Sequence, residues 1–166
     1  MKKCFCGWYH RCQSETQTLA IIPSIHKTSR NAFCNIQILT DTGAFRTSFP
    51  YSDFNRNIRG ISIGRNLFGN DGFTLDIQTP GLQVSGDLHF GDFSSIKYDI
   101  MGPFRYIPFL QCKHSVFSMK HAVAGELIIN GAYYHFQTLL VIWKVTGAGH
   151  FPASMPRPNA FFQADL

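Results

Sequence analysis

The sequence predicts an all-β protein, an antiparallel sandwich or barrel, and three observations lead to this prediction. Phenylalanine is abundant, with 16 residues among 166, and it is accompanied by 14 glycines and 8 prolines. Short segments of alternating apolar and polar residues recur about every 8–12 residues, each bounded by turn-forming residues. Asn130-Gly131 separates two such segments, and this dipeptide is typical of a tight hairpin because both residues accept a positive φ.

The predicted strands can be justified in chain order. Residues 19–22 are an apolar run closed by Pro23, and the segments on both sides of the turn at 41–43 alternate. Alternation resumes on both sides of the turn at 79–81, where Gly86 marks a candidate bulge. The segments with strand character are residues 19–22, 33–38, 44–49, 61–63, 73–77, 82–90, 126–129 and 132–136.

Two regions depart from this pattern. Residues 100–109 form an aromatic loop with two prolines, which cannot be a central strand because proline lacks the N–H that a ladder requires. Residues 141–145 have strand character, but residues 146–166 show little pattern. We therefore predict a β domain over 1–137 and an irregular tail over 138–166. The tail should cover the strand at 133–136 poorly and leave its backbone groups unpaired.

Composition restricts the classes of function. Charged residues make up only 15% and the net charge is +5, with basic residues scattered along the chain, which predicts a solvated surface and no nucleic-acid partner. The five cysteines are an odd number, and Cys4, Cys6, His10 and Cys12 fit no common zinc spacing, so we expect no disulfide framework, metal or cofactor. The start lacks an apolar leader, and no run approaches the ~20 residues of a membrane helix. We therefore expect a cytoplasmic protein, at most peripheral to membranes.

A series of motifs between residues 5 and 136 resembles the tocopherol cyclase-like family. The matching segments, in order, are residues 5–9, 18–23, 63–68, 86–91, 100–104, 108–114 and 118–125. Their order and spacing cover about four-fifths of the chain and carry the resemblance. Cys6 and Gln111 stand where the family pattern has Glu, so any role of those carboxylates is absent here.

The resemblance implies a pair of lipocalin-like barrels or sandwiches about twice this length, of which this chain is an incomplete, amino-terminal part. The family motif expected after Phe136 is missing. Shifting the reading frame by two nucleotides turns Trp143-Lys144 into a Glu codon in the family's register. We therefore expect a frameshift between about His135 and Val141, and the DNA sequence tests it.

The resemblance also implies an activity. A tocopherol cyclase closes a chromanol ring on a prenylated quinol: an acid protonates the prenyl double bond, and the phenol oxygen captures the cation. Such a site requires a dry aromatic pocket and a titrating group. His114 and His121 are the predicted catalytic residues, with Asp76, Asp87 and Asp92 as acids by residue type only. The side chains expected to line an apolar pocket are Trp8, Phe104, Tyr106, Phe109 and Phe117.

Other interpretations remain open. Each of these aromatic side chains has an alternative role as ordinary core, and each histidine an alternative role as a hydrogen-bonded structural residue. The expected partner is an apolar prenylated or lipidic small molecule. The alternatives to an enzyme are a lipid- or isoprenoid-binding barrel without catalysis and a truncated product without function.

Overall fold

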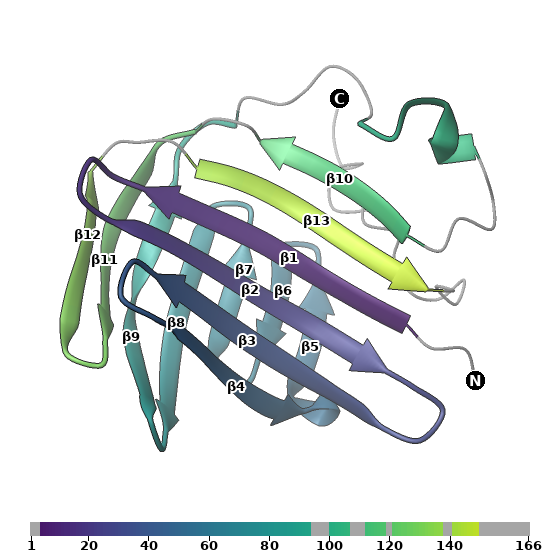
Figure 1. Cartoon of the computed structure of the whole chain (residues 1–166), viewed down its shortest axis with the longest axis horizontal. Helices are drawn as coiled ribbons and strands as arrows, with labels where there is room; N and C mark the ends of the chain where they lie inside the picture. Colours follow the sequence, from purple (N-terminus) through teal and green to yellow (C-terminus); the bar gives the residue numbers. More distant parts are fainter. Residues whose placement is uncertain (1–3, 94–99, 107–111, 119–120, 138–140, 150–166) are drawn as a thin grey trace.

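The structure is a computed structural model that describes residues 4–93, 100–106, 112–118, 121–137 and 141–149 (Figure 1). All strands pair antiparallel, in two open sheets. The first sheet has the order β10-β13-β1-β2-β3-β4 and the second has the order β12-β11-β9-β8-β7-β6-β5. The all-β prediction is therefore confirmed, and the described ladders form no closed barrel.

The two sheets contain thirteen strands in the described residues. The six-stranded sheet contains β1 (Cys4–Gln13), β2 (Thr18–Lys27), β3 (Ala32–Thr40), β4 (Ala44–Pro50), β10 (Cys112–Ser118) and β13 (Val141–Gly149). The seven-stranded sheet contains β5 (Phe54–Asn57), β6 (Gly60–Ile63), β7 (Asn66–Gly69), β8 (Gly72–Thr79), β9 (Leu82–Phe90), β11 (Val123–Ile129) and β12 (Ala132–Gln137). Two short 3-10 helices, η1 (Tyr51–Asp53) and η2 (Gly102–Tyr106), are the helical elements of the described residues.

The core lies between the sheets, whose strands cross steeply (Figure 1). Alternation decides which side chains enter it: in β1, Trp8, His10 and Cys12 are buried, whereas Tyr9 and Arg11 are partly exposed. The seven-stranded sheet contributes Phe68, Phe73 and other apolar side chains from its facing side. Apolar burial is the main favourable term in folding, so packing in this two-layer core fixes the position of the buried histidine and phenylalanine side chains.

The predicted hairpin at Asn130-Gly131 is confirmed. Ile129 pairs with Ala132, and the two turn residues have φ values of 48° and 82°. Gly86, in contrast, is not a bulge, because it pairs in unbroken register with Leu75 on one side and Leu127 on the other.

Within Val141–Gly149, the strand character predicted for residues 141–145 is confirmed, and the irregular structure predicted from residue 146 is wrong. This segment forms β13, which pairs with β1 from Cys4↔Gly149 to Cys12↔Val141 and with β10 on its other side. Hydrogen bonds to the strands on both sides satisfy its backbone groups. The sequence could not show this pairing, because glycine and alanine at residues 147–149 have low strand propensity. Residues 138–140 and 150–166, the rest of the predicted tail, lie outside the described residues.

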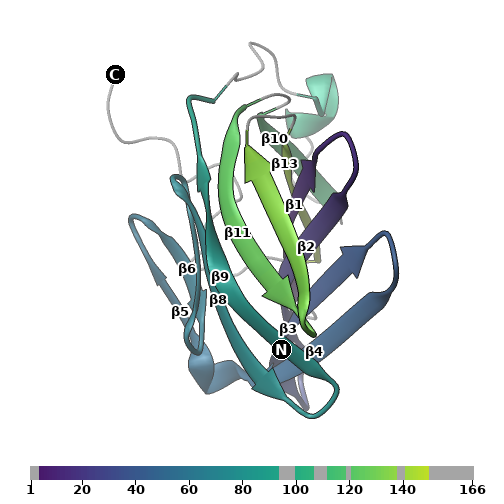
Figure 2. The same cartoon turned by 90° about the vertical axis from the view of Figure 1, so that its left-hand side faces the viewer.

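The edge strand β12 is less open than predicted. The Gln17 side chain donates from Nε2 to the Tyr133 carbonyl at 2.8 Å and accepts from the His135 N–H at 3.2 Å. It thereby takes the place of a peptide group from a neighbouring strand. Figure 2 shows the β11–β12 hairpin beside the β1–β2 hairpin, which carries Gln17 in its connection. Two of the backbone groups predicted to be unpaired are therefore satisfied.

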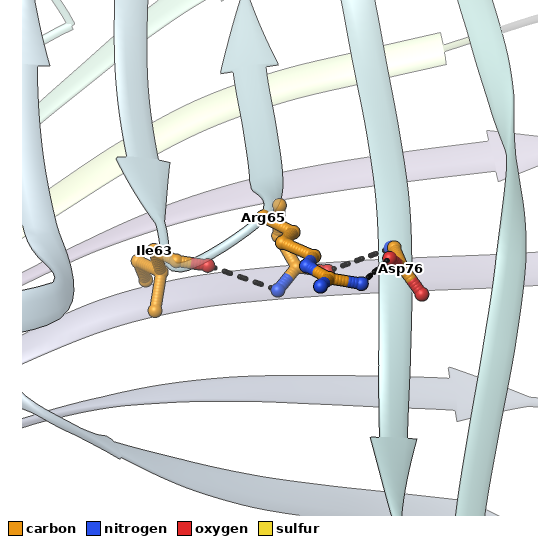
Figure 3. Close-up of polar contacts among 4 residues, drawn as sticks. Ile63, Arg65 and Asp76 are labelled. Carbon is orange, nitrogen blue, oxygen red and sulfur yellow. Dashed lines mark hydrogen bonds and ion pairs between the residues drawn. The ribbon is translucent and has the colours of Figure 1, made fainter.

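A buried asparagine continues the β7–β8 ladder where backbone pairing stops. Asn66 donates from Nδ2 to the Ile63 carbonyl at 2.9 Å, and its Oδ1 accepts from the Asp76 N–H at 3.0 Å. Figure 3 shows these bonds beside the ion pair between Arg65 and Asp76, whose atoms are 3.1 Å apart. The amide is buried and the Arg65 side chain is 84% exposed.

We expect Asn66→Ala to lower the free energy of unfolding by about 2 kcal/mol, because the substitution leaves two backbone groups without their partner. Urea denaturation at neutral pH measures this loss. Arg65→Ala is the matched control: it removes only the exposed ion pair, so the free energy should change by less than ~1 kcal/mol. Equal losses in the two variants would contradict the role given to Asn66.

Candidate functional site

The candidate site is a cluster of two imidazoles and four phenylalanine rings between the sheets. We name it the imidazole cluster, and its members are His10, Phe68, Phe73, Phe90, Phe93 and His121. His10 enters from β1, and His121 lies two residues before β11. The relative exposures of the two histidines are 1% and 4%.

The rings of the cluster pack closely. His10 stacks on Phe68 and Phe90 at centroid distances of 6.1 and 6.0 Å and meets the edge of Phe73 at 5.8 Å. His121 makes near-perpendicular contacts with Phe90 at 4.9 Å and Phe93 at 4.8 Å. Phe90 therefore contacts both imidazoles and joins the two halves of the cluster.

One nitrogen of His121 is held by a hydrogen bond, and the other is available inside the protein. Nδ1 lies 2.9 Å from Oγ of Ser118, which is also buried. Nε2 is buried and has no hydrogen-bond partner. Buried polar atoms nearly always have a partner, so an unsatisfied one requires a physical reason.

Burial keeps both imidazoles uncharged at neutral pH. Desolvation lowers the pKa of His10 to about 3, and the neighbouring His121 contributes to that shift. Desolvation lowers the pKa of His121 to about 4. A second charge beside the first is unfavourable in this apolar environment, so the pair can hold one proton more readily than two.

The residues predicted from sequence are distributed unevenly around this site. His121 is in the cluster, and Trp8 lies in the same core, where it stacks on Phe54 at 6.3 Å. Tyr106 does not line the interior: it is 83% exposed at the end of η2, a helix formed by the proline-containing loop that cannot join a sheet. Asp76 and Asp87 form ion pairs with Arg65 and His89 instead of facing the interior. Asp92 is exposed after β9.

For four other predicted site residues the structure does not describe the side chain. The side chains of Phe104, Phe117 and His114 are outside the described residues, and so is all of Phe109. The backbone of His114 pairs with Thr146, which pairs with Gly7. Ser118 instead belongs to the row that contains His10. His114 and Ser118 therefore occupy different rows of the sheet.

His10 is the member of the site that sequence reasoning missed. We considered it only as a neighbour of cysteines in a metal pattern. The signal that could have identified it is the alternation from Cys6 through Trp8 and His10 to Cys12, which places an imidazole among core side chains. Burial raises the pKa of the Cys12 thiol to about 12, so Cys12 is not a reactive thiolate at neutral pH.

A hollow of about 300 Å³ lies against β6, β7, β8 and β9, and neither imidazole lines it. Exposed polar residues such as Arg59, Asp71 and His89 line it, and Phe68 and Phe73 form part of its wall. It holds none of the buried titratable groups, so the imidazole cluster is the stronger candidate.

Within the described residues, no group of three or more His, Cys, Asp or Glu is placed to hold a metal ion.

The fold and the cluster together define a class: an all-β protein of two crossed antiparallel sheets with a buried imidazole pair between them. Searches with protein-family models, curated proteins and solved structures find no match to this chain. In the part of the chain that the structure describes, no helix has the length and apolar character needed to cross a bilayer.

Proposed function

We propose that the protein takes up a prenylated phenol between its sheets, in a lipocalin-like manner, and closes a chromanol ring on it. The single observation that carries this proposal is the buried Nε2 of His121, which has no partner and lies among phenylalanine rings. A phenolic hydroxyl would satisfy that nitrogen, and the aromatic surroundings suit the ring and its prenyl tail. The family resemblance supplies the reaction class.

The proposed reaction needs no cofactor because it is an isomerisation. A proton adds to the prenyl double bond and leaves a tertiary cation. The phenolic oxygen attacks this cation, a C–O bond forms, and the hydroxyl proton leaves. His121 Nε2 is the proposed acceptor of that proton, and the neighbouring phenylalanine faces stabilise the cation.

The proton for the alkene must come from an acid inside the site. In the described interior, the acid of the right kind is an imidazolium of the pair, since Asp76 and Asp87 are engaged in ion pairs outside it. The lowered pKa values of His10 and His121 make their protonated forms stronger acids than ordinary imidazolium. The proton released by the phenol passes to His121 Nε2, so the pair again holds one proton and its net charge is unchanged.

The second candidate function is binding of such a lipid without turnover. The same lowered pKa values favour it, because they leave little imidazolium at neutral pH. A binding protein needs only the apolar interior and the hydrogen bond from ligand to Nε2.

Incubation of the chain with a prenylated hydroquinone in D₂O tests both candidates. Ring closure should give a chromanol with one deuterium bound to carbon, because the alkene receives its hydrogen from solvent-exchanged acid. His121→Gln should abolish this product. His135→Gln, which changes an exposed histidine paired with Glu126, should retain it.

Calorimetric titration of the same ligand separates the alternatives. Saturable binding without deuterated product would support the lipid-binding function, and His121→Gln should then weaken binding about tenfold for one lost hydrogen bond. Neither binding nor product would overturn the proposal and would agree with a truncated product without function.

A further inference from the structure

The outer faces of the two sheets differ in charge. On the seven-stranded sheet, three acidic side chains each have a basic partner: Asp76 with Arg65 at 3.1 Å, Asp87 with His89 at 2.8 Å and Glu126 with His135 at 3.0 Å. That face therefore carries its own acidic groups, and two of their three basic partners are histidines, which are charged only when protonated.

The outer face of β1–β4 carries basic residues without acidic ones. We name its members, Phe5, Tyr9, Arg11, His26, Phe33 and Arg46, the cationic face. The described outward positions of these four strands include no Asp or Glu, and the nearby acids Glu15, Asp41 and Asp53 lie in the connections. Strand alternation therefore places Arg11 and Arg46 on the same face of the sheet, whose four strands lie side by side in Figure 1.

Neutral groups hold the two arginines in place. Arg11 donates to Oε1 of Gln13 at 2.8 Å. Arg46 donates to the Asn35 amide oxygen at 2.8 Å when that amide is oriented with its oxygen toward donors. Burial and the Arg46 guanidinium lower the pKa of His26, so the arginines supply the charge of this face at neutral pH.

Aromatic rings lie beside these charges. Phe5, His26 and Phe33 are neighbours in one row of the sheet, with centroid distances of 4.9 Å from Phe5 to His26 and 4.8 Å from His26 to Phe33. The His26 and Phe33 rings are nearly parallel, with an angle of 6°. These half-buried rings already contact one another, so they offer less free surface for stacking with nucleotide bases.

We propose that the cationic face docks on the surface of an anionic lipid bilayer. Arginines bonded to neutral groups attract anionic headgroups, and half-exposed aromatic side chains suit the boundary between headgroups and acyl chains. The packed rings favour a lipid surface over single-stranded nucleic acid. This proposal does not depend on the proposed function. The two are compatible, because a bilayer is also where a protein would encounter an apolar ligand.

Flotation with vesicles of phosphatidylcholine alone, or mixed with phosphatidylglycerol, tests the docking. The chain should float only with the mixed vesicles, and high salt should release it. Arg11→Gln and Arg46→Gln should each lower the partition coefficient about fivefold. Arg46→Lys should retain binding because the charge remains.

Arg59→Gln is the matched control, because it removes the same charge from the β5–β6 connection of the other sheet. It should leave flotation unchanged, and thermal melts should show that every variant is folded. Equal loss in Arg59→Gln and Arg46→Gln would overturn the proposal, as would equal binding to neutral vesicles. Salt-sensitive binding of a fluorescent oligonucleotide without flotation would instead assign the face to nucleic acid and also overturn it.

Discussion

Acid should destabilise this protein strongly between pH 6.5 and pH 4. In the unfolded chain a histidine binds a proton below about pH 6.5, whereas the folded protein lowers the pKa of His121 to about 4 and of His10 to about 3. The unfolded state therefore binds more protons in this window, and the free energy of unfolding falls as the pH falls. The full contribution is present above pH 6.5, and the loss by pH 4 should be on the order of 5 kcal/mol.

Urea denaturation at pH 7, 5.5 and 4 measures this dependence. His10→Gln and His121→Gln should each flatten the curve, because each removes one titrating group from the core. His135→Gln should preserve the slope, since that imidazole is exposed and paired with Glu126. A denaturation midpoint unchanged between pH 7 and pH 4 would show that the two imidazoles are not buried as described.

Gly86→Ala should strongly destabilise the centre of the seven-stranded sheet. Gly86 has a φ of 130°, and an added Cβ would lie 2.2 Å from the Glu126 carbonyl oxygen and 3.1 Å from the Leu127 Cα. The obstruction is backbone of a neighbouring strand, which cannot move aside as a flexible side chain can. We expect a loss of roughly 3–5 kcal/mol, from strain in the backbone and overpacking.

Gly81→Ala separates these two causes. Gly81 has a φ of 85° but nothing within 4 Å of an added Cβ, so the substitution should cost only about 1 kcal/mol of conformational strain. Urea denaturation of both variants gives the comparison. A loss for Gly86→Ala no larger than that for Gly81→Ala would contradict the close approach of β9 and β11.

The candidate site could be predicted only in part, and His121 and His10 illustrate why. His121 is a titratable residue in the family-like segment 118–125, so the resemblance and the residue type selected it. His10 was overlooked because its importance comes from packing on Phe68, Phe73 and Phe90 of the opposite sheet. Residues more than fifty positions apart become neighbours only because the two sheets pack across one another. The alternation of residues within each strand does not predict how the sheets pack.

The sequence by itself determined the antiparallel β class, the hairpin at Asn130-Gly131 and the burial of alternate residues in the segment 73–77, because these depend on short-range geometry and turn chemistry. Tertiary structure alone decided that Val141–Gly149 is a central strand, that Gln17 caps β12 and that His10 meets His121. It also decided that the arginines of β1 and β4 share one face. These outcomes depend on long-range pairing, whose free energy comes from backbone groups and burial that appear only when distant strands meet.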